Sequence, residues 1–277
     1  MKVKTTVTLG LRVVVLTLIL FAFYSINFLG LRLIEGVQIS PAMRLLVCFL
    51  HTVVLSYVIV RSRWAGWRLT LAIFFVFYGV TWFQSLIEAV VFLQYLTDIM
   101  PAEAFPGLFL NGAISAALFS PLAVLIHGRM REDKQKQQPN LRLVMPWTKW
   151  VWKLIVIGII YVAVYLSFGM FVFQPLAGEA FGKYYGDLRL PGWFFPFQIM
   201  RGIIWAALAL PVIRMMRGRW WEAGLAVALL FSVLMGSQLL EPEEFMPKAI
   251  RMAHLVETFS SNFLFGWILV LVLNRHH

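Results

Sequence analysis

The sequence predicts an all-α fold, a polytopic membrane bundle of eight transmembrane helices. Of its 277 residues, 61% are hydrophobic and only 13% are charged, whereas about 25% of a soluble domain is charged. Eight apolar stretches are each long enough to cross a bilayer, which takes about 20 residues at a rise of about 1.5 Å each. These observations exclude a soluble enzyme, a disordered chain and a secreted disulfide scaffold. The lone Cys48 cannot form an intrachain disulfide.

The expected spans are separated by short polar connections. Their ranges are 13–31, 41–60, 69–97, 104–126, 154–173, 191–213, 223–240 and 250–273. Charged side chains interrupt the third span at Glu88 and the sixth at Arg201, and Arg251, His254 and Glu257 interrupt the eighth. The second span is the apolar run 45–60, extended outward by residues 41–44. The first span follows a basic amino terminus, as a signal peptide does. It is too long for one and no small-residue cleavage site follows, so we expect it to be retained as a helix.

The distribution of charge predicts the orientation. With both termini and the 2–3, 4–5 and 6–7 loops on one side, that side has 17 Lys and Arg against 3 Asp and Glu, and the other side has 7 against 10. Basic loops stay cytoplasmic, so both termini are expected inside, in a bacterial plasma membrane. Because the basic residues are spread over several loops, the net charge of +11 does not predict nucleic-acid binding.

The two halves of the sequence resemble each other. Arg61-Ser-Arg-Trp64 precedes the third span and Arg217-Gly-Arg-Trp220 precedes the seventh, while Arg44 and Arg201 enter the second and sixth. Because each repeat has an even number of spans, both repeats have the same orientation in the membrane. The axis that relates them would lie along the membrane normal. The alternative is that Arg-Trp anchors recur in any multi-pass protein. The predicted parts are a first four-helix repeat at 1–127, a cytoplasmic linker at 128–149 and a second four-helix repeat at 150–277.

Polar side chains recur on one face of several spans. Gln84 and Glu88 lie one helical turn apart in the third span, and His254 and Glu257 do so in the eighth. Charge inside a bilayer is costly, so such residues usually face a bundle interior or a cavity. Counted along each helix, they fall in the non-cytoplasmic half, which predicts a polar cavity that opens outward. Its candidate residues are Glu88, His254 and Glu257 as catalytic groups and Arg44, Gln84, Asn111, Arg201 and Gln238 as substrate-binding groups.

This set of residues suits acid–base chemistry on a phosphate-bearing substrate. A glutamate would be the general acid or base with His254 beside it, and Arg44 or Arg201 would hold the phosphate. His254 and Glu257 could also contribute two ligands to a divalent metal, with Glu88 as a third, but this spacing alone does not predict a metal site. No HExxH, GxSxG, P-loop or dinucleotide motif indicates a cofactor. The structural alternative is that the acids lie at headgroup level and the arginines pair with them or with lipid phosphates. His51 is expected to be a hydrogen-bonded interior residue, and Glu241, in the 7–8 loop, to be solvated.

Three functions fit these observations. The favoured one is a protein that binds or acts on a lipid or lipid-linked substrate at the outer leaflet. The second is a small proton- or ion-coupled transporter, which needs a path to each side. The third is a non-catalytic membrane subunit whose polar stripes close into interhelical hydrogen bonds. Membrane lipids are the expected partners, a homo-oligomer remains open, and the aromatic 5–6 loop at 174–195 is expected to lie on the outer membrane surface.

Overall fold

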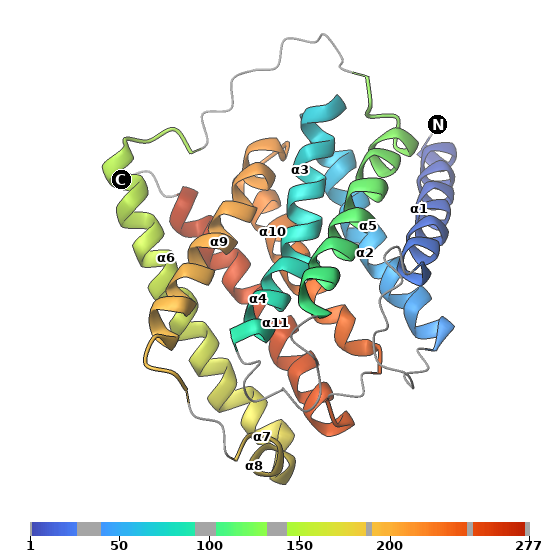
Figure 1. The fold of residues 1–277 in the computed structure, drawn as a ribbon. Helices are drawn as coiled ribbons and strands as arrows, with labels where there is room; N and C mark the ends of the chain where they lie inside the picture. Colours follow the sequence, from blue (N-terminus) through green and yellow to red (C-terminus); the bar gives the residue numbers. More distant parts are fainter. Residues whose placement is uncertain are drawn as a thin grey trace. The chain divides into compact units, whose positions relative to one another are not determined.

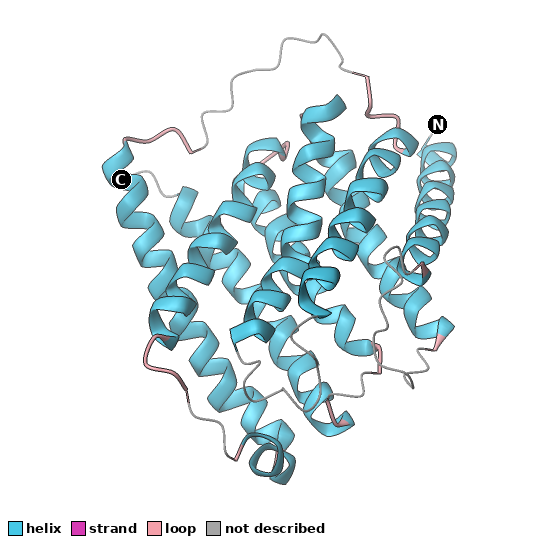
Figure 2. Ribbon diagram, viewed as in Figure 1, coloured by secondary structure: helices cyan, strands magenta, loops and turns pink. Residues whose placement is uncertain are grey.

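The computed structural model describes residues 2–26, 40–91, 104–131, 143–186, 190–242 and 246–274. Every regular element in these ranges is helical (Figure 2). Eight helical segments among them are long and apolar enough to cross a membrane, which confirms an all-α fold with eight candidate spans. The last residues of the expected third span, 92–97, and residues 132–142 of the expected linker lie outside the described ranges.

The chain forms two compact units. Unit 1 comprises Met1–Gln137 together with Leu240–Phe245, and unit 2 comprises Gln138–Leu239 together with Met246–His277. The short segment at 240–245 therefore interrupts unit 2 in the sequence and belongs to unit 1.

Unit 1 holds the first four spans. They are α1 (Lys2–Ser25), α2 (Pro41–Arg61), the continuous run of α3 (Gly66–Tyr78), η1 (Gly79–Phe83) and α4 (Gln84–Val91), and α5 (Ala104–Ile126). Pro41 occupies the first turn of α2, where its missing N–H costs nothing. Gly66 begins α3 with φ +60°, a conformation that favours glycine. In this unit α1 packs on α2 and α5, and α3 packs on α5 (Figure 1).

Unit 2 holds the other four spans and a short helical pair. Its elements are α6 (Trp147–Phe168), η3 (Gly169–Phe173), α7 (Gln174–Ala177), α8 (Glu179–Tyr185), α9 (Phe194–Met215), α10 (Trp220–Gly236), η4 (Ser237–Leu240) and α11 (Lys248–Asn274), except that Leu240, the last residue of η4, belongs to unit 1. The run α6–η3–α7 is longer at both ends than the expected span at 154–173. The short helix α8 follows its far end (Figure 1). Within the unit, α6 packs on α9 and α11, and α10 packs on α11.

Small residues allow close helix crossings in unit 2. A Cβ added to Gly202 on α9 would lie 2.9 Å from the Cα of Gly158 on α6. A Cβ added to Gly266 on α11 would lie 2.7 Å from the Cα of Ala228 on α10. Backbones that approach this closely leave no room for a side chain, which is how helices associate where lipid offers no hydrophobic driving force.

Two spans contain a π-helical segment, η1 in unit 1 and η3 in unit 2. A π-helical turn holds one more residue than an α-helical turn, so it changes which side chains follow one another on a helix face. Both segments begin at a glycine, Gly79 or Gly169, and each lies in the half of its span that the charge pattern predicts to be non-cytoplasmic. Phe173, the last residue of η3, points into the polar cluster described next.

Candidate functional site

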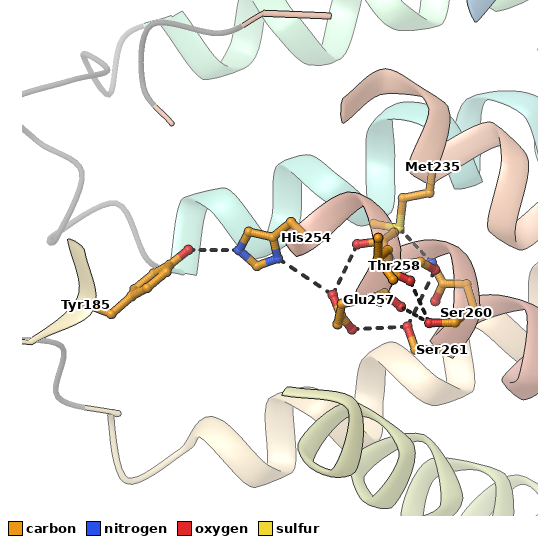
Figure 3. Close-up of polar contacts among 9 residues, drawn as sticks. Tyr185, Met235, His254, Glu257, Thr258, Ser260 and Ser261 are labelled. Carbon is orange, nitrogen blue, oxygen red and sulfur yellow. Dashed lines mark hydrogen bonds and ion pairs between the residues drawn. The ribbon is translucent and has the colours of Figure 1, made fainter. Parts of the chain in front are cut away.

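A group of polar side chains in the described part of unit 2 joins α8 to α11 (Figure 3). The hydroxyl of Tyr185 lies 2.9 Å from Nε2 of His254. On the other side of the ring, Nδ1 of His254 lies 3.6 Å from a carboxylate oxygen of Glu257. The carboxylate favours the tautomer with its proton on Nδ1, since a carboxylate only accepts. That tautomer leaves Nε2 to accept a hydrogen bond from the tyrosine hydroxyl.

Hydroxyl groups from the same helix hold the Glu257 carboxylate. Thr258 donates to Oε2 at 3.2 Å and Ser261 donates to Oε1 at 3.1 Å. Both carboxylate oxygens therefore accept hydrogen bonds, which fixes the carboxylate beside the imidazole. The side chains of His254 and Glu257 are 26% and 14% exposed, so the pair is partly shielded but reachable. The predicted pairing of His254 with Glu257 is present.

Aromatic rings hold the imidazole in place. Phe173 stacks on His254 with ring centroids 4.0 Å apart and an angle of 20° between the planes. Tyr185 meets the same ring edge-on at 6.3 Å. Phe173 itself packs in a cluster with Ile250 and Ala253 of α11, against which Phe181 and Tyr185 of α8 lie. The short helix α8 is thus anchored on α11, and this anchoring places the Tyr185 hydroxyl at the histidine.

Tyr185 was not among the predicted site residues. The Tyr184–Tyr185 pair indicates an interfacial aromatic segment, but nothing in the sequence connects it to His254, which is 69 residues later. Phe173 was missed for the same reason, because it reads as one more apolar residue of a span. Only the fold brings α8 onto α11.

Arg201 of α9 is the third predicted residue of unit 2 with a defined setting. It is 1% exposed, and its Nη1 donates to Oε1 of Gln198 at 3.1 Å. Its guanidinium carbon lies 5.7 Å from the centroid of the Tyr161 ring and 5.9 Å from that of Phe197. Gln238 of η4, also predicted, donates to the carbonyl of Leu234 in the preceding helix α10.

In unit 1, Arg44 belongs to an ion pair. Its Nη2 lies 3.3 Å from Oε2 of Glu241, with side chains 21% and 16% exposed. Its Nη1 donates to the backbone carbonyl of Tyr24. The expectation that Glu241 is solvated is wrong, because this loop carboxylate reaches Arg44 at the start of α2. A phosphate bound to Arg44 would compete with Glu241 for the same guanidinium.

His51 is buried in α2, as expected for an interior residue. Its Nδ1 lies 2.9 Å from the hydroxyl of Tyr24, and its ring meets Phe77 edge-on. Tyr24 also packs edge-on against Trp82 of η1. The group links α1, α2 and the third span, and its contacts are those of a structural interior.

The other predicted residues of unit 1 lie on the third and fourth spans. Gln84 is fully buried at the start of α4, and Glu88 is half-buried one turn later. Asn111 is half-buried on α5. His254 and Glu257 belong to unit 2, so the predicted grouping of Glu88 with them stays a prediction.

The arrangement in unit 2 suits proton transfer. The phenol hydroxyl, the imidazole and the carboxylate contact one another in that order. The imidazole can act as the base that activates a hydroxyl, and the carboxylate orients the imidazole. Within the described ranges, no three His, Cys, Asp or Glu side chains are grouped to hold a metal ion. Comparison with protein families, curated proteins and solved structures finds no match to this chain.

Proposed function

We propose that this protein spans a bacterial plasma membrane with both termini in the cytoplasm and acts on a lipid or lipid-linked substrate at the outer leaflet. The excess of Lys and Arg in the loops that share a side with the termini supports this orientation. In it, the chain between α10 and α11 is outside. His254 then lies about 9 Å and Glu257 about 14 Å below the start of α11, at the depth of the headgroups and upper acyl chains.

The observation that carries the proposal is the chain of contacts Tyr185–His254–Glu257. His254 would take a proton from the Tyr185 hydroxyl, or from a substrate hydroxyl in its place, onto Nε2. Glu257 would stabilise the imidazolium that forms. A 3.6 Å separation is long for a hydrogen bond, and catalytic contacts of this kind commonly tighten when substrate binds.

The surroundings of this group favour a lipid over a water-soluble substrate. Phe171 and Leu176, on either side of Phe173, are 74% and 54% exposed. Val256, next to Glu257 on α11, is 49% exposed. Exposed apolar side chains in a membrane span contact acyl chains. A lipid can therefore lie against the same helices that carry the acid–base group.

Internal duplication would account for the number of spans. In both units the first span packs on the second and on the fourth, and the third packs on the fourth. This shared pattern supports two four-helix repeats at 1–127 and 150–277, joined by a linker at 128–149. The acid–base group would then be a feature of the second repeat, since Tyr185, His254 and Glu257 all belong to it.

Proton-coupled transport is the second candidate. The line of exchangeable groups from Tyr185 through His254 and Glu257 to Ser261 favours it, because such chains relay protons in pumps and transporters. Valinomycin-driven proton uptake into vesicles that contain the protein measures this activity directly. Uptake that is lost in Glu257→Gln, with lipids chemically unchanged, would favour transport over lipid chemistry.

The test of the lipid proposal uses the purified full chain in vesicles of phosphatidylglycerol, phosphatidylethanolamine and a polyprenyl phosphate. Lipids are analysed by mass spectrometry over time. We expect a time-dependent change in one lipid that slows by about 100-fold or more in Glu257→Gln and His254→Gln. Tyr185→Phe, which removes only the hydroxyl, should slow it similarly.

The matched control is Glu179→Gln, which neutralises a carboxylate of the same unit that is 95% exposed. It should leave the rate unchanged, and thermal unfolding should show that every variant is folded. Glu88→Gln asks separately whether unit 1 contributes a carboxylate, and we expect it to abolish activity as well. Equal rates in wild type, Glu257→Gln and Glu179→Gln would reject the carboxylate mechanism.

A further inference from the structure

One face of α9 carries three buried side chains with N–H groups. Gln198, Arg201 and Trp205 are 0%, 1% and 0% exposed. They are spaced three and four residues apart, so they lie on the same side of the helix. All three can donate hydrogen bonds, and the guanidinium is always charged.

The hydrogen bond between Gln198 and Arg201 fixes the direction of the glutamine amide. Oε1 of Gln198 accepts from Nη1 of Arg201 at 3.1 Å, so the amide nitrogen Nε2 carries its two protons on the other side. Among the described residues, Nε2 of Gln198 has no hydrogen-bond partner, although it is buried. Buried N–H groups are nearly always paired, so this amide indicates an acceptor that the described residues do not supply.

Trp205 gives the same indication one turn further along the helix. Its Nε1 is buried and has no acceptor in the described part of the chain. Its ring is fixed by Phe231 of α10, with centroids 4.3 Å apart. A phenylalanine would fill most of this place equally well without an N–H group, so packing alone does not explain the indole.

The surroundings would strengthen binding of an anion. The rings of Tyr161 and Phe197 flank the guanidinium of Arg201, and hydrogen bonds to charge are stronger in such apolar settings than in water. Counted from Phe194, the first residue of α9, the face runs from about 6 Å to about 16 Å into the membrane. This range begins at the depth of lipid headgroups.

We propose that Gln198, Arg201 and Trp205 bind the oxygens of a phosphate group, carried by a lipid or free in solution. A phosphate has several acceptor oxygens and no need of a donor, which matches three N–H-bearing side chains. If the phosphate belongs to a lipid, a phospholipid is the substrate class of the proposed function. Only this identification of the substrate rests on the proposed function. Binding itself does not depend on Tyr185, His254 or Glu257.

The experiment measures binding to the purified full chain in a maltoside detergent, which contains no phosphate. The probes are short-chain phosphatidic acid, diacylglycerol of the same chain length and inorganic phosphate, with affinity measured by calorimetry. The two lipids differ only in the phosphate group. We expect phosphatidic acid or inorganic phosphate to bind and diacylglycerol not to compete. Phosphatidic acid alone would identify a lipid phosphate, and competition by inorganic phosphate would identify a free one.

Two variants each remove one of the N–H-bearing side chains. Trp205→Phe keeps the ring against Phe231 and should weaken binding about tenfold or more, as expected for one hydrogen bond to a charged acceptor. Trp267→Phe is its matched control in α11 and should bind as wild type does. Arg201→Gln should abolish binding, whereas Arg214→Gln, at the exposed end of the same helix, should not.

Unchanged binding in Trp205→Phe would contradict the proposed phosphate site. If Trp205→Phe binds each probe as well as Trp267→Phe does, the indole N–H is a buried donor without a ligand, and the proposal falls. Glu257→Gln should bind phosphatidic acid normally. Normal binding with unchanged lipid turnover in Glu257→Gln would reject the proposed acid–base function and leave the phosphate site standing.

Discussion

Replacing Gly266 with alanine should destabilise the packing of α11 on α10. The added methyl carbon would lie 2.7 Å from the Cα and 2.9 Å from the backbone nitrogen of Ala228, and 3.2 Å from the carbonyl carbon of Val227. All three are backbone atoms, so no side-chain rotation relieves the contact. The helices must move apart, which also loosens the neighbouring contacts along the crossing.

The expected magnitude follows from two opposing terms. Overpacking a close contact costs about 1–3 kcal/mol, while alanine favours a helix over glycine by about 1 kcal/mol. Both nearest atoms are under 3.0 Å away and fixed in a helix, which places the steric cost in the upper part of its range. We expect a net loss of about 1–2 kcal/mol in the free energy of unfolding.

Equilibrium unfolding of the purified chain in mixed detergent–SDS micelles measures this loss. The control is Gly10→Ala in α1, where an added Cβ meets nothing within 4 Å. It should be neutral or stabilise by up to about 1 kcal/mol. If Gly266→Ala proves as stable as wild type or gains as much as Gly10→Ala, the close crossing of α10 and α11 is wrong.

Two further predictions concern unit 1. Arg44→Met and Glu241→Gln should each cost about 1–3 kcal/mol on unfolding, because each leaves a partly buried charge unpaired. The double variant should lose about 1–2 kcal/mol less than the sum, and strictly additive losses would show that the pair contributes nothing. Burial, and to a lesser extent the charge of Arg12, lowers the pKa of His127 to about 4. The unfolded chain then binds a proton between about pH 6.5 and pH 4 that the folded chain does not. Stability is therefore full above that window and falls by at most about 1.4 kcal/mol per pH unit within it. In His127→Gln, whose amide can still reach the Ser56 hydroxyl, this step should disappear from stability measured against pH, and its persistence would assign it to another group.

The eight spans could be predicted from the sequence because each depends on local composition alone. A run of about 20 apolar residues must form a helix in lipid wherever its neighbours lie. The 104–126 span matches α5 residue for residue. The ends of the fifth span moved outward, since Trp147 and Lys149 can begin a helix at the interface that hydropathy does not reveal.

The partners of the polar residues could not be predicted in the same way. Helical periodicity relates His254 to Glu257 because they lie on one helix, and that pairing is present. Tyr185 and Glu241 reach their partners from connecting segments, over 69 and 197 residues. Contacts of this kind arise from the tertiary fold, and no spacing rule encodes them.

The polar stripe of the third span shows a second limit. Spacing at 3.6 residues per turn places Thr81, Gln84, Ser85 and Glu88 on one face. The π-helical segment Gly79–Phe83 contains the first of these residues and shifts the register. Thr81 and Gln84 are buried, while Ser85 and Glu88 are half-buried. The four residues that an ideal α-helix would place on one face therefore do not all share the same burial.

The assignment of Leu240–Phe245 to unit 1 has a consequence for how the protein is made. Arg44 enters the membrane early, but Glu241 is synthesised 197 residues later. At about 5–20 residues per second, the ribosome needs about 10–40 s to cover that distance. For this time the nascent chain holds the guanidinium of Arg44, in the first turn of α2, without its carboxylate partner. Water or a lipid phosphate must solvate the guanidinium meanwhile, so completion of the first unit awaits the seventh span.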